Sequence, residues 1–331
     1  MADNCTINVS NYSIANVNNG TYRLNISKLD IARGILLNGK THWSQLIKTP
    51  RVTFWGFLAN WSNLIIYIND YPELSLSNNF TLLDPQNKTP LSYNIGMGIA
   101  KIVSERILKV AYLQHVGDLV KKGIIQITSG SNEQGDLVGL DKNYEWHVVE
   151  AKGRSNPITN KDRTQAKRQA QKISSINGAT PKSNGYCITY LDIQRNRIEL
   201  CDPPPPEVST AITIQEKAYI KEYYDKLFKP TYNQDSYERL IIISLQLEFV
   251  LFRISFDKKN LFFGVEKHIY NDLRNGGNNI QEIYNSRQEF FERLNLTSLN
   301  DISIGLDGTI LLRNEQNKFL RDNKNIRFIQ P

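Results

Sequence analysis

The 331-residue chain has little cysteine and no pattern of metal-binding cysteines and histidines. Its three cysteines, Cys5, Cys187 and Cys201, are too few for a disulfide framework. No Cys-x-x-Cys pair occurs, and no Cys or His spacing fits a structural zinc site. The sequence therefore excludes a disulfide-rich secreted scaffold and a zinc-finger module, and it favours a reducing compartment.

Targeting and membrane signals are also missing. The N-terminus lacks a basic segment followed by an apolar run, so we expect no signal peptide. The longest apolar stretch, from Leu240 to Phe252, contains Gln246 and Glu248 and is too short to cross a bilayer. We expect a cytoplasmic protein that does not enter a membrane.

Several common catalytic motifs do not occur. There is no Gly-x-Ser-x-Gly and no Walker sequence, so the chain has no visible ATP-driven motor of its own. The four histidines are scattered. His147, on the strand face opposite Glu150, is expected to be structural because a single histidine without a partner rarely marks a metal site. The sequence thus points away from serine hydrolases, P-loop NTPases and histidine-based metalloenzymes.

What the sequence does contain is enough apolar residue, 40%, for a folded core, and a net charge of +7 that permits a polyanionic partner. The length suggests about two domains. We expect an α/β (α+β) protein with three regions. They are an N-terminal region of unknown role at 1–90, a core at 91–205, and a mixed C-terminal region at 206–331 that serves interaction.

The expected core has the order α-β-β-β-α-β-β. Apolar residues at helical spacing predict one amphipathic helix over 96–114. Three strands follow, and Asp141-Lys142-Asn143 forms a turn between the last two. A second helix begins at Asp162 and runs to about Ile176. The expected strands are 123–128, 136–140, 144–152, 186–191 and 197–201.

Outside the core, the predictions are simpler. In the N-terminal region, 51–58 and 63–68 are expected to be strands or buried segments. In the C-terminal region we expect helices at 214–228 and 279–294, a partly alternating segment at 245–256 and a hairpin at Asp307-Gly308. A proline run at 203–206 marks a boundary between the second and third regions.

Three charged residues are predicted to meet at one edge of the core sheet. Glu150 and Lys152 alternate to the same face of one strand. A hairpin turned near Asn143 places Asp136 opposite Glu150. Two carboxylates and a backbone carbonyl are oxygen ligands that suit Mg²⁺ or Mn²⁺, and a neighbouring lysine can stabilise charge on a phosphate. These residues are typical of metal-dependent phosphodiester hydrolysis.

The pattern Asp136…Glu150-x-Lys152 resembles the PD-(D/E)xK nuclease superfamily, with Gly135 in place of the proline. The resemblance covers about residues 96–202. It implies a restriction-endonuclease-like αβββαβ core with additional N- and C-terminal regions. It also implies that Glu105, on the first helix, completes the metal site with Asp136 and Glu150. A glutamine on the second helix, Gln165 rather than Gln169, is implied as a further catalytic residue.

Basic charge is concentrated just after this pattern. Residues 151–182 contain eight lysines and arginines and one acid, so the excess equals that of the whole chain. Such a segment suits a nucleic-acid backbone. The residues expected to bind it are Arg154, Lys161, Arg163, Lys167 and Arg168.

The sequence therefore predicts a Mg²⁺- or Mn²⁺-dependent nuclease that acts on DNA, with a role in prokaryotic restriction or antiphage defence implied by the resemblance. A homodimer, or a helicase or sensor subunit as partner, is also implied. Two alternatives stay open. One is a catalytically silent nucleic-acid-binding module, and the other is a subunit of a larger defence or repair complex that cuts only when a partner licenses it.

Overall fold

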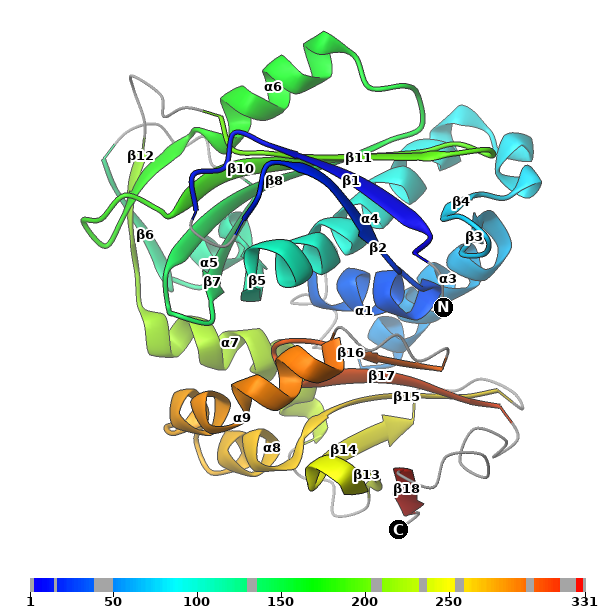
Figure 1. The fold of residues 1–331 in the computed structure, drawn as a ribbon. Helices are drawn as coiled ribbons and strands as arrows, with labels where there is room; N and C mark the ends of the chain where they lie inside the picture. Colours follow the sequence, from blue (N-terminus) through cyan, green and yellow to red (C-terminus); the bar gives the residue numbers. More distant parts are fainter. Residues whose placement is uncertain are drawn as a thin grey trace.

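In the computed structural model the chain is a mixed α/β protein whose described strands form four sheets (Figure 1). Among the described helices, none combines the length and the apolar character needed to cross a membrane. The described residues are 3–14, 17–38, 50–129, 136–203, 210–231, 237–253, 259–295, 301–315 and 326–329.

The largest sheet has seven strands and is of mixed direction. Within it, β8 is antiparallel to β7 and parallel to β10, and β7 is antiparallel to β5. In spatial order the strands are β2 (Gly20–Leu24), β1 (Cys5–Ser10), β11 (Asn196–Cys201), β10 (Ser183–Leu191), β8 (Trp146–Arg154), β7 (Leu137–Asp141) and β5 (Val110–His115).

The predicted hairpin has the predicted register. Leu137 pairs with Val149, which places Asp136 opposite Glu150. The turn is held by the Asp141 carboxylate, whose Oδ1 accepts hydrogen bonds from the backbone amides of Asn143 at 2.8 Å and Glu145 at 2.9 Å. The two strands predicted at 186–191 and 197–201 are also present as β10 and β11, which are antiparallel neighbours.

The strand that precedes the hairpin in the core, and pairs with β7, was predicted wrongly. The helix expected over 96–114 is α4 (Pro85–Val103) followed by a π-helical turn, η2 (Ser104–Leu108). It ends because Lys109 adopts a left-handed conformation with φ 61°, and the next residues form β5. The segment expected to be the first strand is β6 (Ile125–Ser129), which lies in a separate three-stranded sheet with β12 (Thr210–Ile214) and β9 (Ile173–Ile176).

The N-terminal region differs from the prediction in two respects. Its two strands, β1 and β2, extend the seven-stranded sheet, because β1 pairs in parallel with β11. The segment expected to hold strands is instead the helix α3 (Pro50–Tyr67), followed by a short β3–β4 hairpin (Ile68–Asn69 and Ser75–Leu76) and η1 (Asn78–Leu82). The expected boundary at residue 90 falls inside α4, so the N-terminal and core regions share elements.

The C-terminal region carries a six-stranded sheet with helices beside it (Figure 1). The predicted helices and hairpin are present, and α7 begins at Glu216, two residues after the predicted start at 214. The sheet contains β16 (Ile302–Ile304), β17 (Thr309–Glu315), β15 (Lys259–Glu266), β14 (Leu247–Arg253), β13 (Glu238–Ile242) and β18 (Ile326–Ile329). The helices are α7 (Glu216–Phe228), α8 (Lys267–Arg274) and α9 (Ile280–Asn295).

Helices cover both faces of the seven-stranded sheet. In Figure 1, α6 (Asn160–Ala170) lies over one face, and α4 and α1 (Lys28–Asn38) lie over the other. α4 approaches β8 closely, since a Cβ added at Gly153 would lie 1.7 Å from the Ser92 carbonyl oxygen. Only glycine permits this backbone contact, so α4 is fixed next to the end of β8. α5 (Val116–Lys121) follows β5 directly at the neighbouring sheet edge.

Candidate active site

Asp136, Glu150 and Lys152 come together where β7 begins and β8 approaches its end. The backbone amide of Asp136 donates to Glu150 Oε2 at 3.2 Å. Lys152 Nζ lies 2.5 Å from Glu150 Oε1. The Glu150 side chain has no exposed surface, whereas a quarter of the Lys152 side chain is exposed. The lysine therefore stands between a buried carboxylate and solvent.

The face of the sheet that carries these side chains is the one under α6. The parallel register sets Glu150 beside Tyr186 and Lys152 beside Ile188, so all four side chains lie on one face. Tyr186 and Ile188 pack with Ala166 of α6 in one small apolar cluster. α6 thus forms one wall beside the candidate site.

The surroundings of Glu150 disfavour the charged form of its carboxylate. Burial raises its pKa to about 7, and the negative charge of Asp136 adds to this increase, while Lys152 opposes it. Removing a carboxylate from water penalises its charged form, and a second carboxylate nearby penalises it further. A cation between the two acids would relieve both effects.

These groups fit a divalent metal ion in part. Asp136 and Glu150 supply two carboxylates, and Mg²⁺ in enzymes is often held by one or two carboxylates with waters and substrate phosphate completing its shell. Within the described residues, no group of three or more His, Cys, Asp or Glu side chains is arranged to hold a metal ion. A metal here would therefore depend on the substrate or on water for its remaining ligands.

Tyr93 is a neighbour that the sequence did not reveal. It lies on α4, and its backbone nitrogen would be 3.0 Å from a Cβ placed on Gly153, one residue after Lys152. Burial raises the pKa of the Tyr93 hydroxyl, and the charges of Asp136 and then Glu150 raise it further. The phenol stays protonated and lies in the field of both carboxylates. Its signal in the sequence is only its spacing from Gly96, which makes the other close contact with Gly153.

Asp118 and His115 also stand near this sheet edge. Burial lowers the pKa of His115, and the charges of Asp118 and Asp136 oppose that decrease. His115 Nε2 lies 2.8 Å from the Asn38 carbonyl oxygen. This contact with the Asn38 carbonyl oxygen positions the imidazole ring of His115.

Glu105 has a different place from the one that the resemblance implied. Its side chain is fully buried, with Oε2 at 2.6 Å from Arg33 Nη2 and Oε1 at 2.7 Å from Lys101 Nζ. Lys101 Nζ also lies 3.6 Å from Asp307 Oδ2, and Arg33 Nη1 lies 3.8 Å from Asp307 Oδ1. Both carboxylate oxygens of Glu105 are engaged by cations, so we assign it to a buried ion-pair cluster and not to the metal site. This cluster joins α1, α4 and the β16–β17 turn.

Of the two glutamines considered for the catalytic role on the second helix, Gln169 fits the structure better than Gln165. The inner stripe of α6 consists of Asp162, Ala166 and Ala170. Gln169 is half-buried beside this stripe, and among the described residues its Oε1 is buried without a hydrogen-bond partner. Gln165 is exposed. The helix itself starts after Thr159, which forms a capping box with Asp162, rather than at Asp162 as predicted.

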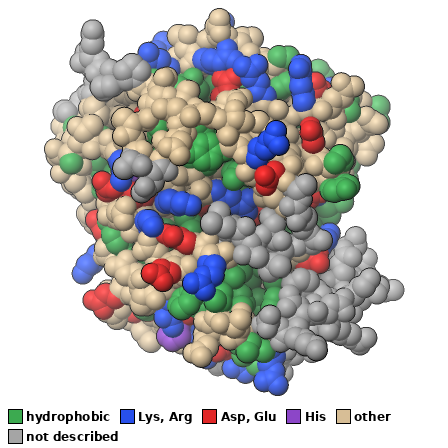
Figure 2. Space-filling view, in the orientation of Figure 1, with side chains coloured by type: hydrophobic (Ala, Val, Ile, Leu, Met, Phe, Trp, Pro, Cys, Tyr) green, Lys and Arg blue, Asp and Glu red, His purple; other side chains and the backbone are tan. Residues whose placement is uncertain are grey.

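The five predicted nucleic-acid contacts are not equivalent. Arg163 is held by Glu199 through two hydrogen bonds, Nε to Oε2 at 2.7 Å and Nη2 to Oε1 at 2.8 Å. Arg154 forms an ion pair with Asp162 but stays substantially exposed. The remaining three, Lys161, Lys167 and Arg168, are exposed on α6. Figure 2 shows Lys and Arg side chains gathered at the top of the view, where α6 lies in Figure 1.

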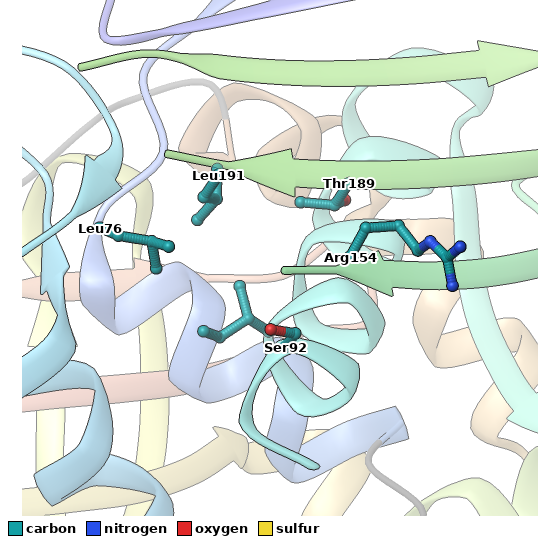
Figure 3. Close-up of a pocket in the computed structure, with 6 residues that line it drawn as sticks. Leu76, Ser92, Arg154, Thr189 and Leu191 are labelled. Carbon is teal, nitrogen blue, oxygen red and sulfur yellow. The ribbon is translucent and has the colours of Figure 1, made fainter. Parts of the chain in front are cut away.

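Two other features do not form a site. A small cavity lies on the α4 side of the sheet, lined by Leu76, Ser92, Ile95, Arg154, Thr189 and Leu191; Figure 3 shows the Arg154 guanidinium extending away from its apolar side chains. His147 lies between Ser183 Oγ, at 2.8 Å, and Asp141 Oδ2, at 3.4 Å, but all three are buried. The prediction that His147 is structural agrees with this burial, which leaves a substrate no access.

No family model matches the chain, and no curated protein or solved structure is significantly similar to it. The geometry of the residues is therefore the basis for the proposals that follow.

Proposed function

We propose that the protein is a metal-dependent nuclease that hydrolyses phosphodiester bonds of DNA. The observation that carries this proposal is the triad of Asp136, Glu150 and Lys152 at one sheet edge, with Lys152 Nζ 2.5 Å from Glu150 Oε1. Two carboxylates and an adjacent lysine whose side chain is one quarter exposed suit a phosphate group better than a neutral substrate. The raised pKa of Glu150 supports a site that gains from a bound cation.

Each residue has a separate role in this proposal. Asp136 and Glu150 hold Mg²⁺ or Mn²⁺, which supplies polarisation of a phosphate oxygen and a more acidic bound water. Lys152 turns from Glu150 towards the phosphate and donates to an oxygen on which charge develops. Hydrolysis adds water across one P–O bond, so the water oxygen joins phosphorus and the departing oxygen takes up a proton. Gln169, beside the inner stripe of α6, supplies an unpaired acceptor at the wall of the site.

The arrangement of the core supports the same proposal. We infer a restriction-endonuclease-like core made of α4, β5, β7, β8, α6 and β10, in the order αβββαβ. Its support is the antiparallel β5–β7–β8 meander and the parallel addition of β10 across the α6 crossover. A role in restriction or antiphage defence, with a protein partner or as a homodimer, is part of the proposal that rests on the resemblance alone.

One observation favours a second candidate function. Glu105 is bound in the buried ion-pair cluster, so the site has two carboxylates where the resemblance implied three. A site with fewer metal ligands suits a nucleic-acid-binding module that has lost catalysis. It also suits an enzyme that a partner must complete.

Cleavage assays separate these candidates. Wild type and Asp136→Asn are incubated with supercoiled plasmid, linear duplex DNA, single-stranded DNA and RNA, each with Mg²⁺, Mn²⁺ or EDTA. The nuclease proposal predicts cutting of DNA by wild type in Mg²⁺ or Mn²⁺, and none in EDTA or by the variant. Binding of DNA without cleavage under every condition would favour the binding module. Activity that is equal in wild type and Asp136→Asn would contradict the proposed site.

A further inference from the structure

The two flanks of α6 differ in what they face. Asp162, Ala166 and Ala170 form the inner stripe. At 3.6 residues per turn, the row Lys161, Gln165, Gln169 lies on one side of this stripe, and the row Arg163, Lys167 lies on the other.

Contacts fix the direction of each flank. Arg163 reaches Glu199 of β11. Asp162, on the opposite side of the stripe centre, pairs with Arg154 of β8. The strands follow one another as β11-β10-β8-β7, so one flank of α6 points towards β11 and the other towards β8. The β8 flank is therefore the one beside Glu150 and Lys152.

The two flanks also differ in how far their polar groups are already satisfied. On the β11 flank, Glu199 binds Arg163 and lies 2.8 Å from Arg197 Nε. On the β8 flank, Lys161 and Gln165 are exposed. In the described part of the chain no ion pair is formed by Lys161, or by Lys167 on the β11 flank. The buried Oε1 of Gln169 has no described hydrogen-bond partner. The β8 flank thus keeps more of its polar groups available to a ligand.

We propose that the phosphate backbone of the substrate runs along the β8 flank of α6, over Lys161 and Gln165 and towards Lys152, and that Arg163 and Lys167 lie off this path. The inference rests on the proposed nuclease function and narrows its binding surface. Lys161 and Gln169 are separated by eight residue steps, or about 12 Å along the helix axis, which matches the axial length of roughly three to four nucleotides of one strand. A cation at the outer end and two amides along the row suit sequence-independent contact with phosphates and sugars.

Lys161→Ala and Lys167→Ala form a matched pair that tests the path. Both lysines are exposed on the same helix, and each change removes one positive charge. Binding of a fluorescent duplex is measured by anisotropy in EDTA over a range of salt concentrations. At about 0.15 M salt the screening length is about 8 Å. The loss of one positive charge should therefore weaken DNA binding slightly, and to the same extent, in both variants. A direct phosphate contact adds a local effect to only one of them.

The proposal predicts that Lys161→Ala binds about 3- to 10-fold more weakly than wild type and lowers the slope of log affinity against log salt by about 1. Lys167→Ala should stay within about 2-fold of wild type at the same salt. In cleavage, Lys161→Ala should raise KM and leave kcat unchanged, because the contact lies away from the reacting bond. Equal effects of the two changes, or a larger effect of Lys167→Ala, would overturn the path.

Failure of the path and failure of the nuclease function give different results. If wild type cleaves DNA in a metal-dependent way and Lys161→Ala and Lys167→Ala bind DNA equally, the nuclease function is kept and the proposed backbone path is rejected. A difference between the variants in binding, with no cleavage by wild type, keeps the path and rejects the function. If wild type neither binds nor cuts DNA or RNA, both are rejected.

Discussion

The backbone amide of Asp136 donates to Glu150 Oε2 across 3.2 Å, and the charge of the Asp136 side chain raises the pKa of the same glutamate. The hairpin register brings these two residues together, so the buried carboxylate of Glu150 lies beside a second negative charge. Lys152 offsets only part of this cost. A site built in this way gives up some stability for a position in which a cation binds well.

Replacing Glu150 should increase stability at a pH at which its buried carboxylate is charged. The folded-state pKa of Glu150 is about 7, above its ordinary value of 4.5. Folded protein therefore holds a proton more tightly than unfolded chain, and the stability due to Glu150 is complete below pH 4.5 and lost as pH rises through 7. We predict that Glu150→Gln is more stable than wild type by about 1–3 kcal/mol at pH 8. The advantage should vanish near pH 4.5, as measured by urea unfolding in EDTA. Equal stability of the two proteins at pH 8 would contradict the raised pKa.

Metal binding should depend on the same proton. A divalent ion competes with the proton of Glu150, so its affinity should rise between pH 6 and pH 8. We predict that 10 mM Mg²⁺ raises the melting temperature of wild type by about 2–4 °C at pH 8 and by less at pH 6. Asp136→Asn should remove most of the increase. An increase that is independent of pH and of Asp136 would place the ion elsewhere.

Glu105 should matter for stability and not as a metal ligand. It is fully buried between Arg33 and Lys101, so Glu105→Gln removes one of the two carboxylates, Glu105 and Asp307, that face both buried cations. The expected loss of stability is about 3–5 kcal/mol. Glu145→Gln, which breaks an exposed pair with Lys182, is the control and should cost less than about 1 kcal/mol. If Glu105→Gln folds as stably as wild type yet fails to bind Mg²⁺, the assignment to the buried cluster is incorrect.

Tyr93 should support the reaction without being needed for folding. Tyr93→Phe keeps the ring and removes the hydroxyl that lies in the field of Asp136 and Glu150. Loss of one hydrogen-bonding group next to a charged group corresponds to about a tenfold decrease in rate. We predict kcat lower by about that factor, with KM and the melting temperature nearly unchanged. A variant as active as wild type would show that Tyr93 only packs.

The sequence predicted the hairpin well because its information is local. The Asp141 turn sets the register, and strand alternation then determines which side chains meet. β5 was missed because its residues, from Val110 onwards, are buried on both faces, and such a run gives no periodicity that separates strand from helix. The termination of the helix depends on the left-handed Lys109, which no composition rule marks.

The wider surroundings of the site could not be predicted because they depend on distant contacts. Glu105 is paired with Arg33, 72 residues away, and its role follows from that partner. The choice between Gln165 and Gln169 depends on how α6 is rotated over the sheet, which the Arg163–Glu199 contact shows and the sequence does not. Periodicity places a residue on a helix face, but packing decides where the face points.

The most direct test of the central claim is single-turnover cleavage of supercoiled plasmid by wild type, Lys152→Ala and Lys142→Ala in Mg²⁺ or Mn²⁺. Lys142 lies in the turn at the other end of the same hairpin and pairs with Glu292 at 2.8 Å, so it controls for loss of one positive charge away from the candidate site. If Asp136, Glu150 and Lys152 form a catalytic centre, Lys152→Ala should cut at least about 100-fold more slowly while binding DNA as wild type does, and Lys142→Ala should keep its rate. Cleavage by Lys152→Ala at the rate of wild type would contradict the account.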